Sequence, residues 1–272
     1  MEKGSLYLIP TPIGNLDDIS KRAIETLKMV DIILCEDTRH SSKLLNHLGI
    51  NKRLYSYYEH NEKMRAEEAI EWLKQGVNIG LITDAGMPAV SDPGYIIVDL
   101  VHKNELKVYA IPGANAALTA LVLSGFDSWR FQFIGFLPRQ NSKKREELLE
   151  TINYNGLTII YESPNRLMHT LKMMEEIFPD RRIFIAREIT KLYEEHFRGR
   201  VVDAALHFGS KEIKGEIVIV LDSFEAETEE VDIAAEFQKL LDNGIKKSQA
   251  VKEVSAKYGI NKNEVYKVSL EL

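Results

Sequence analysis

Two carboxylates and an arginine follow one another where a short apolar run ends. Residues 31–35 indicate a buried strand, and Glu36, Asp37 and Arg39 come directly after it. Charged side chains in such a place are costly unless they are paired or used, because burial removes them from water. A carboxylate there could remove a proton from a bound hydroxyl, and a cation could hold a phosphate. The structural alternative is an ion pair between Asp37 and Arg39.

Three stretches rich in glycine and proline also interrupt the apolar runs of the first half, at residues 10–18, 84–94 and 111–116. Glycine permits positive φ and proline fixes φ, so such turns bring backbone N–H and C=O groups close to a ligand. The longest, residues 84–94, opens directly onto a predicted helix. Its amides could hold a carboxylate or a ribose hydroxyl, and the N-terminus of the helix favours negative charge.

These stretches connect alternating β-branched runs and amphipathic segments. Strands are expected at residues 6–9, 31–35, 77–83 and 107–111, and helices at 19–29, 64–74, 95–102 and 116–123. Such alternation predicts a parallel-dominated sheet with helices on both faces. Ligands bind beyond the carboxyl ends of the strands in sheets of this kind. The loops expected to converge on one cleft follow Ile9, Cys35, Ile82 and Ile111.

A second alternating series follows an aromatic-rich segment at residues 125–139. Strands are expected at 157–161, 182–187 and 215–221, and helices at 166–177 and 201–208, which makes a second α/β layer. Basic residues recur near the strand ends, among them Arg187, Arg198 and Arg200. They could bind phosphate, or nearby glutamates could neutralise them in a structural network. The loop at 139–145, with Lys143 and Lys144, is a further basic patch or a solvated linker.

The remaining residues differ in composition from both series. Residues 225–232 hold five acidic residues and no basic one, which predicts a linker. Helical patterns at 233–241 and 248–258, a turn at 259–263 and a final apolar run resemble a helix-turn-helix unit. Its local balance is positive because of Lys239, Lys246, Lys247, Lys252, Lys257, Lys262 and Lys267. That patch suits a phosphate backbone, and a small helical cap with solvated lysines is an equal alternative. The predicted domains are therefore 1–124, 125–224 and 225–272.

Composition excludes several classes of protein. A net charge of −6 argues against coating nucleic acid by bulk electrostatics but leaves local patches open. No apolar run is long enough to cross a bilayer, so no membrane association is expected. The single cysteine, Cys35, and a first segment without a leader pattern predict a cytoplasmic protein. The histidines lack paired ligand spacing, so no metal is expected, and no Walker A or G-x-S-x-G sequence occurs.

An ordered series of short motifs runs from residue 6 to residue 221. It comprises TPIGNL at 11–16, EDTR at 36–39, DAG at 84–86, SDPG at 91–94, PGA at 112–114, GFLP at 135–138, ESP at 162–164 with Arg166, RE at 187–188 with Lys191, and GE at 215–216. The series resembles the tetrapyrrole-methylase family. Within it, the chain is similar to the bacterial branch that 2′-O-methylates a cytidine of 16S ribosomal RNA, and the basic tail resembles that branch's C-terminal extension.

The resemblance implies two α/β domains with S-adenosylmethionine in the cleft between them, a homodimer, and the small ribosomal subunit as partner. The cofactor contacts that it carries over, several through backbone atoms, are Pro12, Gly14, Asp84, Ala85, Gly86, Pro88, Val90, Ser91, Asn115, Ala116, Tyr161, Ala186 and Gly215. The tetrapyrrole branch often has a glycine-rich first loop, whereas this chain has TPIGN there. That departure favours RNA.

Methylation of a ribose hydroxyl requires alignment of the reacting atoms and removal of a proton. The predicted base is Glu36 or Asp37, and Arg39 or Lys191 is predicted to position the ribose phosphate. Single-stranded RNA is the more accessible target, because its ribose can enter a cleft that a duplex cannot. Two alternatives are methylation of a small molecule such as a tetrapyrrole and a non-catalytic RNA-binding factor. The lysine-rich tail argues against the first, and the intact cleft motifs argue against the second.

Overall fold

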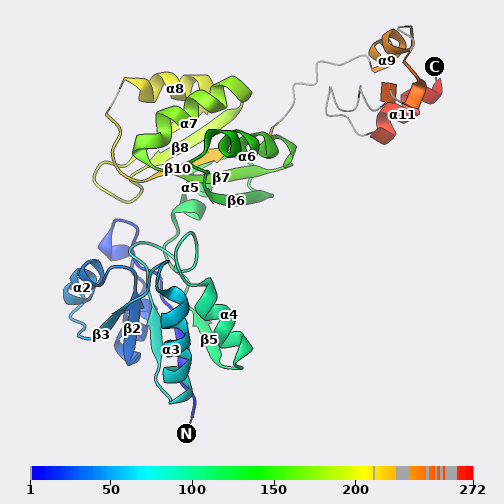
Figure 1. The fold of residues 1–272 in the computed structure, drawn as a ribbon. Coiled ribbons are helices and arrows are strands. Elements are labelled where there is room, and N and C mark those ends of the chain that lie inside the picture. The colour runs from blue at the N-terminus through cyan, green and yellow to red at the C-terminus, as the bar shows by residue number, and fades with distance from the viewer. Residues whose placement is uncertain are drawn as a thin grey trace. The chain divides into compact units, whose positions relative to one another are not determined.

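The chain folds as two compact units, Met1–Ser223 and Phe224–Leu272 (Figure 1). The computed structural model describes residues 2–210, 212–224, 233–242, 245–248, 250–251, 254 and 262–271. The first unit contains two sheets, and the second contains short helices.

The first sheet has five parallel strands in the order β3-β2-β4-β1-β5. They are β1 (Ser5–Leu8), β2 (Ile32–Cys35), β3 (Arg53–Ser56), β4 (Ile79–Leu81) and β5 (Lys107–Ala110). The intervening helices are η1 (Leu16–Asp18), α1 (Lys21–Met29), α2 (Thr38–His47), α3 (Glu62–Lys74) and α4 (Tyr95–Lys103). Because all the strands are parallel, their carboxyl ends share one edge of the sheet.

Both faces of this sheet are covered, because its strands alternate their side chains between two apolar clusters. Leu6 and Leu34 pack with the buried side of α3 and with Ile97 of α4. Ile33 packs on the opposite face with Leu27 of α1. The predicted parallel sheet with helices on both faces is confirmed.

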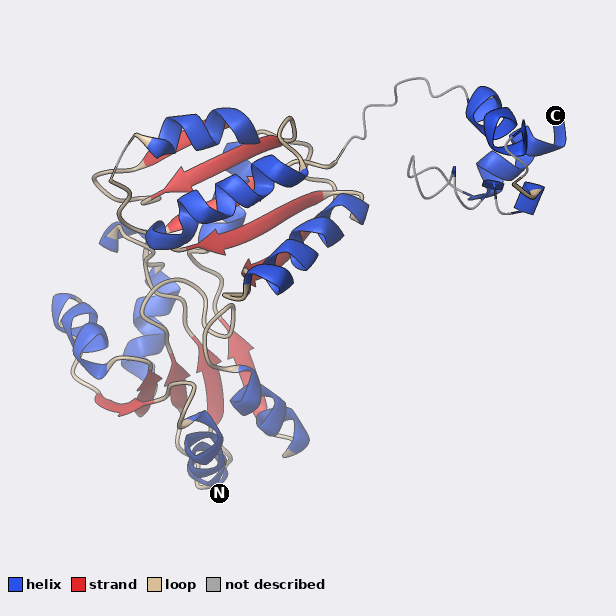
Figure 2. Ribbon diagram, turned by 45° about the horizontal axis from the view of Figure 1, so that its top comes forward, coloured by secondary structure: helices blue, strands red, loops and turns tan. Residues whose placement is uncertain are grey.

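The second sheet is mixed and has the order β6-β7-β10-β8-β9. Its strands are β6 (Phe131–Phe136), β7 (Leu157–Glu162), β8 (Arg182–Arg187), β9 (Glu195–Arg200) and β10 (Ile217–Leu221). Only β6 and β7 pair in parallel, and the other pairs are antiparallel. Figure 2 shows helices lying across it, and those on the side away from α5 are α6 (Asn141–Asn153), α7 (Pro164–Ile177) and α8 (Val201–Gly209).

Helix α5 (Ala116–Ser124) packs against β7, β8 and β10 of the second sheet, although the sequence analysis placed it in the first domain. Its buried side chains Ala117, Ala120 and Leu121 share a cluster with Ile159 of β7. The helix ends at Gly125, whose φ of 60° is left-handed. The predicted domain boundary after residue 124 stays a prediction.

A buried polar network fastens α6 and α7 to the end of β7. The Lys144 Nζ donates to Thr170 Oγ1 at 2.9 Å, and the Thr170 hydroxyl donates to Glu162 Oε2 at 2.6 Å. The Glu162 carboxylate also lies 3.1 Å from Arg166 Nε and accepts the Ser163 N–H at 2.8 Å. Lys144, expected in a basic patch or solvated linker, is only 1% exposed because it faces this carboxylate. That expectation was wrong for Lys144, and burial also lowers the pKa of its ammonium.

The second unit includes α9 (Ile233–Asp242) and α11 (Lys262–Glu271). Its apolar cluster contains Phe237, Val251 and Val265. The predicted acidic linker at 225–232, the core of the predicted turn at 259–261, Lys252 and Lys257 lie outside the described residues. The helix-turn-helix prediction and the helical-cap alternative therefore both stay open.

We expect Glu162→Gln to lower the free energy of unfolding by about 3 kcal/mol, because it leaves a buried lysine without its carboxylate partner. Chemical denaturation at neutral pH measures this change. Asp99→Asn is the control, since Asp99 pairs with Lys103 at 2.6 Å on an exposed helix surface. It should change stability by no more than about 0.5 kcal/mol. Equal effects of the two substitutions would mean that the buried network does not stabilise the packing of α6 and α7 on the second sheet.

Candidate active site

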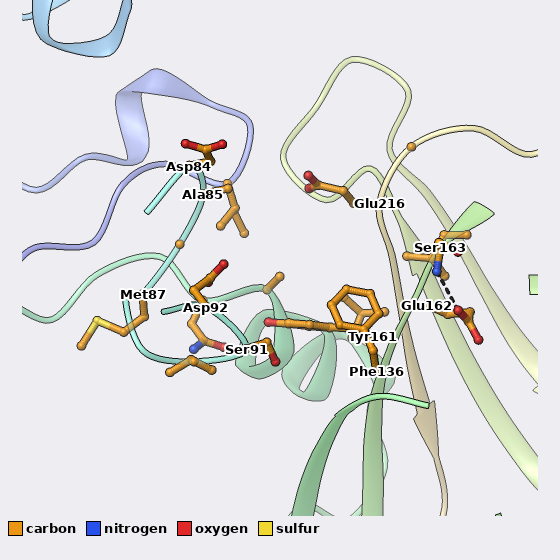
Figure 3. Close-up of a pocket in the computed structure, with 18 of the residues that line it drawn as sticks. Asp84, Ala85, Met87, Ser91, Asp92, Phe136, Tyr161, Glu162, Ser163 and Glu216 are labelled. Atoms are coloured by element: carbon orange, nitrogen blue, oxygen red, sulfur yellow. Dashed lines mark hydrogen bonds between the residues drawn. The ribbon is translucent and has the colours of Figure 1, made fainter. Parts of the chain in front are cut away.

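One pocket in the first unit collects loops from both sheets, and Figure 3 shows its side chains. Its cavity volume is about 330 Å³. The first sheet contributes residues that follow β1, β4 and β5, and the second contributes residues of β6, β7 and β10 and the start of α7. A cavity of this size is within the range of small-molecule sites.

Backbone hydrogen bonds tie the loops of the first sheet together beneath this pocket. The Thr11 N–H donates to the Gly86 carbonyl at 3.0 Å, and the Gly86 N–H donates back to Thr11 at 3.1 Å. The buried Thr11 hydroxyl donates to the Thr83 carbonyl at 3.0 Å. The loops after β1 and β4 therefore form one fixed edge of the site.

The loop after β4 has a strained backbone. Ala89 and Ser91 have φ of 65° and 62°, which L-residues with a Cβ rarely adopt. A bulge in β6 near Gly135 approaches this loop, since a Cβ added at Gly135 would lie 3.2 Å from Ser91 Oγ. Strain of this kind concentrates at functional sites, where surrounding contacts hold it in place.

The wall from the second sheet is aromatic and apolar. The Tyr161 ring packs edge-on against Phe133 at 4.9 Å and Phe136 at 5.6 Å between centroids. Burial raises the pKa of the Tyr161 hydroxyl, which is therefore neutral at physiological pH. Ile217 and Val218 of β10 continue this surface. Such a wall suits a flat, partly apolar ligand.

Carboxylates line the remaining part of the pocket. Asp84 and Asp92 reach it from the loop after β4, and Glu216 reaches it from the segment before β10 (Figure 3). Burial, together with the negative charges of Glu36, Asp84 and Glu216, raises the pKa of Asp92 to about 6, although the Thr83 hydroxyl opposes the shift. Burial and the neighbouring Asp84 and Asp37 also raise the pKa of Glu36. A cationic ligand would relieve this mutual repulsion.

Asp37 and Arg39 form the structural pair that the sequence left open. The Asp37 carboxylate caps α2 by accepting the Arg39 N–H at 2.8 Å, and it pairs with the Arg39 guanidinium at 3.1 Å. These interactions lower the pKa of Asp37 to about 2. The Asp37 N–H donates to Asp84 Oδ1 at 3.3 Å, which links the pair to the pocket edge. A carboxylate with so low a pKa is a weak base.

Lys191 bridges two carboxylates at the second-sheet side of the pocket. Its Nζ donates to Glu188 at 2.8 Å and to Glu216 at 3.1 Å. Burial opposes the charge of Lys191, but these carboxylates outweigh it and raise the lysine pKa. Two glycines make room for this arrangement, because a Cβ on Gly14 would lie 2.4 Å from Lys191 Cγ and one on Gly215 would lie 2.3 Å from the Glu188 carboxyl.

The basic residues at the strand ends of the second sheet are also paired. Arg187 contacts Glu195 at 3.0 Å, and Arg200 contacts Asp180 and Asp203 at 3.0 and 2.9 Å. The Arg198 side chain donates to the Ser124 carbonyl at 2.8 Å. The structural-network alternative accounts for Arg187 and Arg200, whereas Arg198 contacts a backbone carbonyl.

The pocket brings together many of the residues predicted from sequence. Those lining it are Asp84, Ala85, Gly86, Val90, Ser91, Asn115, Ala116, Tyr161 and Gly215. Pro12, Gly14, Pro88 and Ala186 are not among its lining residues, although Gly14 follows the lining residue Ile13 and Ala186 pairs with Val218 in the sheet. Glu36, Asp37, Arg39 and Lys191 lie outside the lining as well. Their predicted roles stay predictions.

Met87 also lines the pocket and lies within residues 86–90, which the resemblance carries over as cofactor contacts. Sequence reasoning missed part of the lining, namely Ile13, Asp92, Phe136, Glu162, Ser163, Pro164, Glu216, Ile217 and Val218. Asp92 could have been predicted from sequence, because it is the second aspartate of the loop at residues 84–94, which was already expected to bind a ligand. Glu216 and Phe136 belong to motifs in the resemblance, but nothing in their local sequence shows that they face the same cavity as Asp92.

Residues 5–205 match the family described as Tetrapyrrole (Corrin/Porphyrin) Methylases. The chain belongs to this family. Family members use S-adenosylmethionine as methyl donor.

A curated relative from Halalkalibacterium halodurans, named Ribosomal RNA small subunit methyltransferase I, is 43% identical over 98% of this chain and 95% of its own. A Bacillus subtilis protein with the same name is 42% identical over 97% and 94%. One from Thermotoga maritima is 46% identical over 82% of this chain and 100% of its own.

Solved structures of two other proteins share the fold. The methyltransferase CobJ superposes with a TM-score of 0.62 at 16% identity, over 81% of this chain and 94% of that one. Diphthine synthase superposes with a TM-score of 0.61 at 15% identity, over 81% and 90%. At such identities the likeness establishes the fold alone.

In the parts of the chain that the structure describes, no helix is long and apolar enough to span a membrane. The same parts contain no group of three or more histidine, cysteine, aspartate or glutamate side chains that could hold a metal ion.

We expect Gly14→Ala to destabilise the protein more than Gly49→Ala. Both glycines have positive φ, but space is open around Gly49, so Gly49→Ala measures the backbone strain alone, about 1 kcal/mol. Gly14→Ala adds a clash with Lys191 and Thr190, which should cost a further 1 to 3 kcal/mol, roughly. Thermal unfolding compares the two. Indistinguishable melting temperatures would contradict the close contact between the first loop and Lys191.

We expect Asp92→Asn to stabilise the ligand-free protein at pH 8 and to have no effect near pH 4. The folded pKa of Asp92, about 6, exceeds the ordinary value of 3.8, so stability conferred by the protonated carboxyl falls as pH rises from 4 to 6. At pH 8 the substitution should raise the free energy of unfolding by about 2 kcal/mol, a value reduced to allow for the partial exposure of Asp92.

Asp37→Asn provides the comparison of opposite sign. The depressed pKa of Asp37 contributes stability at neutral pH that is lost as pH falls from 4 towards 2. The substitution should therefore destabilise at pH 7, and its effect should vanish in acid. Denaturant unfolding of both variants from pH 2 to pH 8 measures these trends, and parallel curves for both variants would contradict the opposite pKa shifts of Asp92 and Asp37.

Proposed function

We propose that this protein transfers a methyl group from S-adenosylmethionine to the ribose 2′-oxygen of a cytidine in 16S ribosomal RNA of the small ribosomal subunit. The assignment of ribosomal RNA as substrate rests on the similarity, over nearly the whole chain, to relatives named Ribosomal RNA small subunit methyltransferase I. The cytidine and the 2′-oxygen come from the resemblance of the motif series.

The chemistry of the pocket supports the methyl donor. S-adenosylmethionine carries sulfonium and ammonium cations, a carboxylate and a flat adenine. Asp84 and Glu216 supply negative charge for the cations, and the wall around Tyr161 suits the adenine. The N-terminus of α5, where the Asn115 side chain accepts the Leu118 N–H at 3.0 Å, favours the carboxylate. When bound, the donor supplies an electrophilic methyl group.

The cofactor contacts assigned from the resemblance become part of this proposal. The Thr11–Gly86 bridge fixes the loop of residues 84–91 at Gly86, which supports contacts through backbone atoms. Arg39 is the better placed of the two predicted cations for RNA, because its side chain is 89% exposed. Lys191 is already engaged by Glu188 and Glu216, so its proposed contribution is to hold the Glu216 side of the pocket.

A small molecule such as a tetrapyrrole stays the alternative substrate, because the fold is shared with enzymes that act on such molecules. The TPIGN first loop favours RNA over it. A non-catalytic RNA-binding role is disfavoured by the pocket, whose carboxylates and aromatic wall fit the donor. A homodimer, a cytoplasmic location and three domains divided at residues 124 and 224 complete the proposal as the resemblance and composition predict them.

The test is transfer of radiolabelled methyl from S-adenosylmethionine to small ribosomal subunits from cells that lack this gene. We expect label on a ribose 2′-oxygen of a cytidine in 16S rRNA, located by primer extension and nucleoside analysis. Small subunits from cells that retain the gene are the matched control and should accept little label. Label on a base, or on an added tetrapyrrole with none on the RNA, would refute the proposed substrate.

A further inference from the structure

We infer that Asp92 accepts the proton released by the hydroxyl that is methylated, an inference that rests on the proposed function and adds a catalytic residue to it. Glu36 and Asp37, the bases predicted from sequence, do not line the pocket. Asp92 does, and Figure 3 shows its carboxylate pointing into the cavity.

The backbone around Asp92 is built to present this side chain. Ser91, its neighbour, has a φ of 62°, and Gly94, two residues later, has a φ of 154°. A Cβ at Gly94 would lie 2.8 Å from the Ala89 side chain, so the loop folds tightly upon itself. A connection of this length needs no such strain merely to join β4 to α4. The strained conformation supports a function for the side chain that it aims into the pocket.

The groups that face Asp92 favour proton uptake. Glu36 follows β2, Asp84 follows β4 and Glu216 precedes β10, and all three are negative neighbours of Asp92. Tyr161 of β7 is a neutral neighbour, and the Thr83 hydroxyl opposes protonation. Within the described residues, no lysine, arginine or histidine forms a salt bridge with Asp92. In the ligand-free protein its pKa of about 6 is close to neutral pH, which suits a general base, whereas the Arg39 pair holds the pKa of Asp37 near 2.

The step balances in atoms and charge. The 2′-oxygen forms a bond to the methyl carbon as the carbon–sulfur bond breaks, and the electron pair of that bond stays on sulfur. The hydroxyl proton passes to the Asp92 carboxylate, which then releases it to solvent. The single positive charge that the sulfonium loses therefore leaves as that proton, and no oxidant or reductant is involved.

The central experiment compares Asp92→Asn with the wild type on small ribosomal subunits at saturating S-adenosylmethionine. We expect kcat to fall about a hundredfold, the usual effect of losing a general base. The Kd for S-adenosylmethionine, measured by calorimetry, should change by no more than about fivefold, since one partly solvated charge is lost. Asp84→Asn removes a charge from the same pocket and should reduce kcat less. Asp99→Asn, on the exposed face of α4, should leave kcat unchanged.

Two further measurements separate proton acceptance from a structural role. The wild-type kcat should rise with pH to a plateau, Asp92→Glu should keep a rise with a shifted midpoint, and Asp92→Asn should lose it. Carboxyl ¹³C NMR of the ligand-free protein should show one aspartate that titrates near pH 6 and is missing from Asp92→Asn.

An unchanged kcat in Asp92→Asn, or a larger loss in Glu36→Gln than in Asp92→Asn, would overturn the inference. A loss confined to the Kd would also overturn it, by assigning Asp92 to cofactor binding. If the wild type labels no ribose, the proposed function fails instead, whereas an aspartate with an ordinary midpoint in the NMR titration would count against Asp92 alone.

Discussion

The site depends on a pair of backbone hydrogen bonds between Thr11 and Gly86. Parallel strands bring their carboxyl ends to one edge, but they leave the loops beyond that edge free to diverge. The bridge joins the loops after β1 and β4 without using a side chain, and Gly86 permits it because its φ is 82°. The strained turn at Ala89 and Ser91 starts from this fixed point. The direction of the Asp92 carboxylate follows from peptide geometry set several residues earlier.

The carboxylates near the pocket edge have two different electrostatic environments. Asp37 pairs with Arg39 and caps α2, so a cation and the N-terminus of a helix both stabilise its negative charge. Asp84, Asp92 and Glu36 repel one another, and Lys191 offsets part of the charge on Glu216 from the other sheet. Glu36 and Asp37 are adjacent in sequence, but their pKa values shift in opposite directions. Asp37 contacts the Arg39 guanidinium, whereas Glu36 has other carboxylates as its charged neighbours.

Much of the first sheet could be predicted from sequence, since alternation of apolar strands with amphipathic helices has few other solutions. The residues after β4 and β5 were predicted at the site for the same reason. Strand β3 was not predicted because it is a short edge strand of four residues with a charged start, and α2 was not because its sequence is largely polar. The burial of Lys144 depends on Glu162 and Thr170, which are distant in sequence, so local composition suggested a solvated residue instead. The approach of Asp92 to Glu216 is equally non-local.

Helix α5 follows the last strand of the first sheet but covers the second, sharing a cluster with Ile159, Phe184 and Val220. The second layer therefore includes a helix that precedes all of its strands in the sequence. A gene fragment that encodes only residues after 125 would yield a sheet with one apolar face open to water, prone to association with other chains. During synthesis on the ribosome, this helix emerges before any strand that it covers. The apolar side of this helix is therefore covered only after β7, β8 and β10 have followed it, and recombination between relatives within this region would be tolerated only where helix and sheet are inherited together.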